Sequence, residues 1–294
     1  MPWILFAILA GFFVALSDAL NKKYLSKEGF IKMALARTLG ALPFLLPAFF
    51  YFLFVKKTIF YFTFHFWLNT LILLILEIAA TLFYMKGIEI SPLSASLPFL
   101  SFTPVFIIFT GFFILGERVS ITGTIGILLI VLGAYLIHLP RIKRGLLAPI
   151  RGIWEERGSL FILITAFIYG ITSVLGKRGL LLSDPLFFAA FYFSLLSLVT
   201  PLLLKLLYRV EIFPFLKGHF KGVFLVGGTQ AIMCLFHMLA LSRLETAYMI
   251  ALKRTSILFA VLLGWFFFRE KYAGLRLSAA FLMFLGILII AFWK

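Results

Sequence analysis

Polar side chains recur at helical spacing inside stretches of the sequence that are otherwise apolar. Glu77, Thr81 and Tyr84 stand at positions i, i+4 and i+7, which places them on one stripe of a helix. Polar groups are costly inside a membrane, so they indicate where function resides. We expect this stripe to line a cavity. The alternative is that each group only joins neighbouring helices by hydrogen bonds.

A second polar stripe follows 153 residues further along the chain and consists of Gln230, Cys234 and His237. A hydrogen-bonding face that occurs twice is expected if both stripes line one cavity, and we assign Gln230 and His237 to ligand contacts. The alternative for His237 is a buried histidine with internal partners. Cys234 is the single cysteine, which excludes disulfides within the chain and multi-cysteine metal sites. We predict neither a metal nor a cofactor.

Lys253 and Arg254 are adjacent cations inside another apolar stretch. Such cations need an anion, a water-filled cavity or an interface within reach of their side chains. One hypothesis is that they bind a carboxylate or phosphate group of a ligand, the lysine as a point charge and the arginine as a two-pronged donor. The other hypothesis is an internal ion pair with Glu77 or Asp18.

Asp18 lies near the end of the first apolar stretch, where its carboxyl could take up and release a proton. Glu77 is the other candidate for proton coupling. Arg37, near the start of the second stretch, is either the counter-ion of Asp18 or a ligand contact, and we predict the structural role.

Four further residues are predicted to have structural or gating roles. Pro98 and Pro104 lie where proline opens backbone hydrogen bonds and offers a kink. The equivalent later stretch lacks these prolines, so we expect the earlier helix to bend more. Glu117 and Glu270 follow the ends of two apolar stretches, where we expect them to pair with the basic residues beside them or to cap the next helix.

Membrane helices must position these residues, because 63% of the 294 residues are hydrophobic and 38 are phenylalanine, too many for one soluble core. Continuous apolar runs of about twenty residues are long enough to cross a bilayer as helices, and barrel strands would alternate instead. The first run lacks the features of a cleaved signal peptide. The sequence predicts an all-α membrane protein with ten transmembrane helices, at 3–20, 31–55, 67–85, 93–115, 121–139, 160–175, 185–207, 223–241, 247–268 and 277–293.

The chain also repeats itself. The segment from Phe83 to Glu117 aligns without a gap with the segment from Phe236 to Glu270, and SDALNKKYL from Ser17 matches TSVLGKRGL at an offset of 155. We therefore divide the chain into a first repeat (1–139), a basic connector (140–157) and a second repeat (158–294). Five helices per repeat is an odd number, so the second repeat enters the bilayer from the opposite side. Inverted repeats around a central cavity are the predicted architecture.

The formal net charge is +16, and the basic residues lie mostly in short loops between apolar runs. This pattern favours attraction to anionic lipid headgroups over binding of nucleic acid. In the predicted topology, loops opposite the termini hold more than twice as many lysines and arginines as loops on the terminal side. The positive-inside rule therefore places both termini outside.

Linked segments of both halves resemble the EamA family of the drug/metabolite transporter superfamily. They are SDALNKKYL, ALARTLGALPFLL, SPLSASLPFLSFTPVF running into FILGERV, and LKRTSILFAVLLGWFFFREK. The resemblance implies ten helices, two five-helix repeats, a central cavity and cytoplasmic termini, the last in disagreement with the charge count. Lys253 and Arg254 are similar to the phosphate-binding pair of the plastid phosphate translocators, but the mirrored Leu100 and Ser101 carry no charge.

The resemblance implies a secondary transporter of small polar metabolites, amino acids or related compounds, working by alternating access, with export as the default direction. We expect it in the plasma or inner membrane, as a monomer or homodimer, with substrate, lipid and protons as partners. Exchange of anionic or phosphorylated metabolites is one alternative, and a channel is another, although no selectivity-filter motif occurs. No enzyme motif appears, so we predict no catalytic residue.

Overall fold

The structure is a computed structural model that describes residues 2–56, 63–91, 96–136, 157–268 and 274–293. All regular secondary structure in these residues is helical. Six of the helical segments are long and apolar enough to cross a membrane, judged by length and composition. The chain therefore has the helical membrane-type fold that the sequence predicts, while the crossing of ten helices stays a prediction.

The first half contains α1 (Pro2–Leu25), the 3-10 turn η1 (Ser26–Glu28), α2 (Phe30–Leu39), α3 (Leu42–Phe50), the π-helical turn η2 (Tyr51–Val55), α4 (Phe64–Ile90), the 3-10 helix η3 (Leu97–Phe102), α6 (Thr103–Leu115) and α7 (Ile121–Leu136). The second half contains α9 (Arg157–Leu181), α10 (Pro185–Tyr208), α11 (Ile212–Leu241), α12 (Thr246–Lys253), α13 (Ser256–Phe268) and α14 (Gly274–Trp293). Most of the predicted connector, residues 140–156, lies outside the described residues.

Local sequence signals fix several helix ends. The hydroxyl of Thr63 accepts a hydrogen bond from the amide of Phe66 and caps α4, and the carboxylate of Asp184 caps α10 just before Pro185. Gly116 ends α6 in the left-handed conformation, at φ 68°, which a residue without a Cβ adopts without strain. Three predicted spans are nevertheless interrupted, because α2 and α3, η3 and α6, and α12 and α13 are separate elements.

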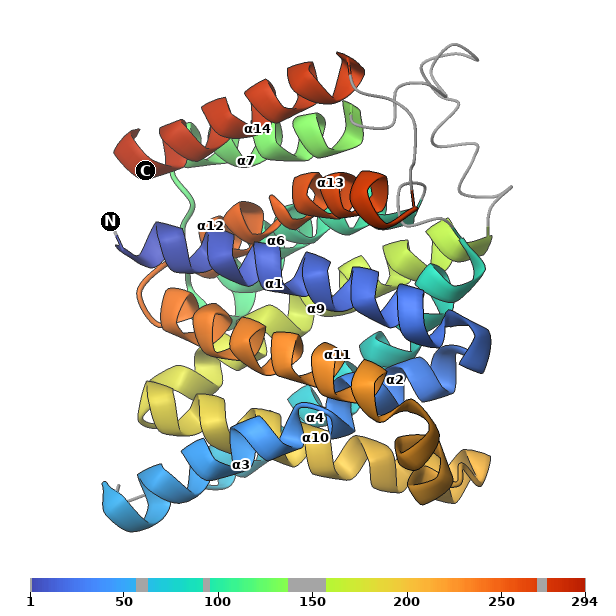
Figure 1. The fold of residues 1–294 in the computed structure, drawn as a ribbon. Coiled ribbons are helices and arrows are strands. Elements are labelled where there is room, and N and C mark those ends of the chain that lie inside the picture. Colours follow the sequence, from blue (N-terminus) through green and yellow to red (C-terminus); the bar gives the residue numbers. More distant parts are fainter. Residues whose placement is uncertain (1, 57–62, 92–95, 137–156, 269–273, 294) are drawn as a thin grey trace.

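The helices lie roughly side by side in layers, with α7 and α14 forming one outer layer and α3 and α10 lying at the opposite edge (Figure 1). The start of α1 and the end of α14 lie at the same end of the molecule (Figure 1). Gly126 and Gly286 lie where α7 and α14 meet, and a Cβ built on Gly126 would come within 3.0 Å of the Gly286 carbonyl oxygen. This close approach explains why small residues are needed there.

The two halves are interleaved. Helix α1 packs against α11 and α13 of the second half, and its repeat equivalent α9 packs against α4 and α6 of the first half. Each half therefore contributes its first helix to the other half. The helices that carry the two polar stripes, α4 and α11, are held in equivalent surroundings by this exchange.

The same equivalence extends to two lysines, Lys22 on α1 and Lys177 on α9, which the 155-residue offset places on each other. Each side chain donates to two backbone carbonyls at the end of the stripe-bearing helix of its own half, where cations are favoured. The bonds join Lys22 to Ile88 (3.1 Å) and Ser91 (2.7 Å), and Lys177 to Leu241 (2.6 Å) and Leu244 (2.8 Å).

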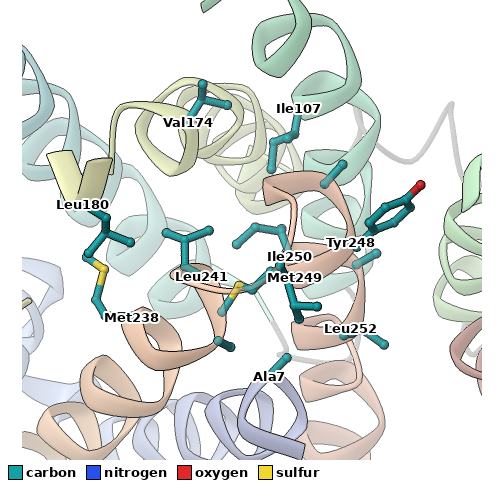
Figure 2. Close-up of a cluster of buried hydrophobic side chains, with 14 of the residues drawn as sticks. Ala7, Ile107, Val174, Leu180, Met238, Leu241, Tyr248, Met249, Ile250 and Leu252 are labelled. Carbon is teal, nitrogen blue, oxygen red and sulfur yellow. The ribbon is translucent and has the colours of Figure 1, made fainter. Parts of the chain in front are cut away.

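A buried apolar cluster gathers side chains from both halves near the end of the molecule that carries the termini. Figure 2 shows Ala7 of α1, Ile107 of α6 and Leu241 of α11 directed toward the residues of α12. Such interdigitated packing is the main source of stability between membrane helices. The cluster also includes Met238 and Ile250, which line the cavity described next, and it therefore forms part of the cavity wall.

Candidate functional site

A cavity of about 100 Å³ lies between the two halves, with room for several water molecules or a small solute. Helices α1, α2, α4, α9, α10, α11, α12 and α13 all contribute to its wall. Every residue that the sequence assigns to ligand binding or proton coupling lines it, together with Arg37. These residues are Asp18, Arg37, Glu77, Thr81, Tyr84, Gln230, His237, Lys253 and Arg254.

The break between α12 and α13 brings the two adjacent cations to the cavity. Lys253 is the last residue of α12, and Arg254 follows outside the helix. The hydroxyl of Thr255 donates to the carbonyl oxygen of Leu252 at 2.9 Å, a local bond that competes with helical pairing. Gly11 of α1 packs directly on the break, where an added Cβ would lie 2.8 Å from the Lys253 carbonyl oxygen.

Both repeats are interrupted at this equivalent position, since η3 replaces α-helix in the first half. In the later helix a threonine bond and a close glycine contact accompany the break. The expectation that the earlier helix bends more stays a prediction. Pro104 lies buried at the start of α6, whereas the side chain of Pro98 lies outside the described residues. Discontinuous helices at a repeat interface are typical of transporter binding sites.

Asp18, Arg37 and Tyr84 form one buried polar group across α1, α2 and α4. Arg37 Nη1 lies 2.7 Å from Asp18 Oδ1, and the Tyr84 hydroxyl donates to Asp18 Oδ2 at 2.5 Å. The guanidinium also lies 5.2 Å from the centroid of the Tyr84 ring, in cation–π range. Both carboxylate oxygens are satisfied, so Arg37 has the counter-ion position that we predicted for it.

A second polar group of the cavity wall lies on α11 and α12. Lys253 Nζ lies 3.0 Å from His237 Nδ1, and because an ammonium only donates, this ring nitrogen is the acceptor. Arg254 Nη2 donates to the hydroxyl of Thr103 at 2.8 Å, while Arg254 Nε has no partner in the described part of the chain.

The predicted internal ion pair does not form in this conformation. Among the described residues, neither Lys253 nor Arg254 lies within 4.0 Å of a carboxylate oxygen. Asp18 is occupied by its arginine and tyrosine partners instead. Glu77 shares the cavity wall with Thr172 of α9, and it interacts with the charge of Lys253 from beyond contact distance. Glu77, Lys253 and Arg254 can therefore still form ion pairs with a ligand.

Glu117 has a different role from the one that its position suggests. Its carboxylate accepts hydrogen bonds from the amide (3.0 Å) and hydroxyl (3.1 Å) of Thr246, at the start of α12. It therefore stabilises a helix start in the other half, where negative charge is favoured, rather than the start of α7. Ser120 caps α7 instead, through a 2.9 Å bond to the amide of Gly123. Glu270 lies outside the described residues.

Comparisons with known proteins give the family. The EamA-like transporter family matches residues 1–139 and 156–292, which together make up nearly the whole chain. The chain belongs to this family. EamA members are transporters of the drug/metabolite superfamily, so the protein is a multi-pass integral membrane transporter.

The comparison with solved structures shows a shared fold over nearly the whole chain. A solved crystal structure described only as that of a protein matches with a TM-score of 0.70 and 16% identity, covering 98% of this chain and 99% of the other. At this identity the likeness shows a shared fold. The comparison with curated proteins gave no match.

The cavity is also lined by residues that the sequence analysis missed, among them Tyr169, Thr172 and Tyr192. The rings of Tyr169 and Tyr84 lie 6.3 Å apart, and the Tyr192 hydroxyl has no partner among the described residues. A signal existed for Tyr169, which stands four residues before Ser173, the repeat partner of Asp18. Tyr192 falls on Arg37 at the same 155-residue offset.

Proposed function

We propose that this EamA protein is a secondary transporter that moves small polar metabolites, amino acids or related carboxylated compounds, by alternating access. The observation that carries the proposal is the cavity between the halves, whose wall holds the carboxylate of Glu77 and the two cations Lys253 and Arg254. A solute with a carboxylate and a polar or cationic group would find partners at both places. Export from the cell is the direction that the family implies.

The architecture behind this proposal is a pair of inverted five-helix repeats in ten transmembrane helices. Support comes from the exchange of α1 and α9 between the halves and from the mirrored bonds of Lys22 and Lys177. Inverted repeats let one set of contacts open toward either side of the membrane, because the two open states are built from equivalent packing.

Glu77 is the better of the two candidates for proton coupling. Asp18 is bound by Arg37 and Tyr84, so a proton could reach it only after a buried ion pair is broken. Glu77 lines the cavity and has no counter-ion within 4.0 Å among the described residues. We infer that Glu77 takes up and releases the coupled proton during transport.

Uptake of radiolabelled amino acids into proteoliposomes, with and without an imposed pH difference, tests the function and the coupling together. We expect a pH difference to raise the wild-type rate and to leave the rate of Glu77→Gln unchanged, because an amide cannot exchange this proton. Glu211→Gln, at an exposed glutamate before α11, is the matched control and should behave as wild type. Equal wild-type rates in the two conditions would reject proton coupling, and no uptake of any metabolite would reject transport.

A further inference from the structure

The charges around the cavity do not cancel. Besides His237, its described lining holds two carboxylates, Asp18 and Glu77, and the side chains of Arg37, Lys253 and Arg254. Asp18 and Arg37 are in direct contact and offset each other. The remaining three groups therefore decide what net charge the cavity presents to a ligand.

Glu77 and Lys253 contribute zero to this sum as long as Glu77 has not taken up the coupled proton from solution. With both ionised, the negative and positive charges cancel, and transfer of a proton from the ammonium to the carboxylate makes both neutral. His237 adds no charge, since its Nδ1 accepts a bond from Lys253. One positive charge is left over, and it resides on Arg254, which stays protonated in proteins.

The contacts of Arg254 agree with a positive charge that is not compensated. The residue is only 4% exposed, its hydrogen-bond partner Thr103 is neutral, and its Nε has no partner among the described residues. A buried cation without a counter-ion is costly, and an anion in contact with it removes that cost. The free Nε edge of a guanidinium suits the two oxygens of a carboxylate.

Resting on the proposed transport function, we propose that Arg254 is the anchor for a carboxylate and that the preferred substrate is a small organic monoanion. A zwitterionic amino acid would leave the positive charge uncompensated. A phosphate monoester carries about −1.5 to −2 charges near neutral pH and would overcompensate it. Lys253, already engaged with His237 and balanced by Glu77, has a secondary part in anion binding.

Matched ligands test the charge rule directly. Binding of alanine, leucine and phenylalanine to the full-length protein in detergent micelles is compared, by titration calorimetry, with binding of the 2-hydroxy acids of the same carbon skeletons. The two series differ in one group, an ammonium against a hydroxyl, and so in net charge. We expect the hydroxy acids to bind roughly tenfold more tightly or better, as expected for one compensated charge.

The role of Arg254 is tested with Arg254→Gln, which removes the surplus and can still bond to Thr103. We expect this variant to lose roughly tenfold or more in affinity for the hydroxy acids and to retain its weaker affinity for the amino acids. Lys205→Gln, on an exposed part of α10, is the control and should match wild type. If the glutamine variant does not fold, Arg254→Lys keeps the charge and should retain the monoanion preference with weaker binding.

Each result decides between the proposals. Equal or tighter binding of amino acids by the wild type would overturn the charge rule and leave the transport proposal standing. Unchanged hydroxy-acid affinity in folded Arg254→Gln would overturn the anchor. Failure of both series to bind would overturn the monoanion inference, while uptake of another metabolite class into proteoliposomes would still support transport.

Discussion

Replacing Asp18 by asparagine isolates the buried ion pair from the rest of the cavity. The side chains of Asp18 and Arg37 are 3% and 9% exposed, and their closest atoms are 2.7 Å apart. Asparagine keeps the size of the side chain and removes its charge, so the Arg37 cation stays buried without a counter-ion. Removal of one partner from a buried pair costs about 3–5 kcal/mol. The Asp18→Asn variant should therefore unfold about a thousandfold more readily if the cost is near 4 kcal/mol.

Unfolding equilibria of the purified protein, followed in mixed micelles as the fraction of denaturing detergent rises, measure this loss. Tyr84→Phe removes only one hydrogen bond from the same aspartate, and such bonds in membrane proteins average about 0.6 kcal/mol, with a maximum near 1.7. Asp184→Asn is the matched control, because asparagine caps a helix as well as aspartate does. The expected order of destabilisation is Asp18→Asn, then Tyr84→Phe, then the control.

The double variant Asp18→Asn with Arg37→Gln completes the test. Since it leaves no unpaired charge, it should be more stable than Asp18→Asn alone, although it carries more changes. A loss below about 1 kcal/mol for Asp18→Asn, or a double variant no better than the single one, would refute the view that an unpaired cation causes the damage. If Asp18→Asn kept full stability but lost transport, Asp18 would again be a candidate for proton coupling.

Two further substitutions test the interleaved scaffold. Lys22→Met and Lys177→Met each remove a cation from two backbone carbonyls at a helix end, so each should lower the free energy of unfolding by about 1.5–3 kcal/mol. Because the bonds are mirrored, unfolding equilibria should give similar losses for the two variants. Clearly unequal losses would contradict equivalent roles. Glu117→Gln weakens the hydrogen bonds to Thr246 at the start of α12 and should lower the free energy of unfolding by about 1 kcal/mol in the same assay. Substrate affinity should stay unchanged, and a large loss of affinity would make Glu117 part of the gate.

Periodicity and repetition were enough to predict which residues meet at the cavity. The i, i+4, i+7 spacing of Glu77, Thr81 and Tyr84 requires only that the stretch be helical, and the structure places all three on the cavity wall. The 153-residue offset extends the same result to Gln230 and His237. Such predictions succeed because a helix converts spacing along the chain into a shared direction.

Partner choice and helix breaks were beyond the sequence because they depend on neighbouring helices. Lys253 bonds to His237 rather than to a carboxylate, since the packing of α11 and α12 brings the two side chains within 3.0 Å of each other. The break after Lys253 coincides with the close approach of Gly11, a residue of another helix, and with the local bond of Thr255. Glu117 stabilises α12 of the opposite half because the halves interleave, an arrangement that local capping rules do not contain.

The scaffold and the site follow opposite rules of symmetry. The proposed alternation between two access states is easiest when both are built from equivalent contacts, and the mirrored lysines and the exchanged α1 and α9 would supply such contacts. A small substrate has no such symmetry, and the charges are accordingly unequal: Asp18 mirrors Ser173, and Arg254 mirrors Ser101. Substitutions at mirrored scaffold positions should therefore change stability in both halves alike, whereas substitutions at charged positions should change binding from one half only.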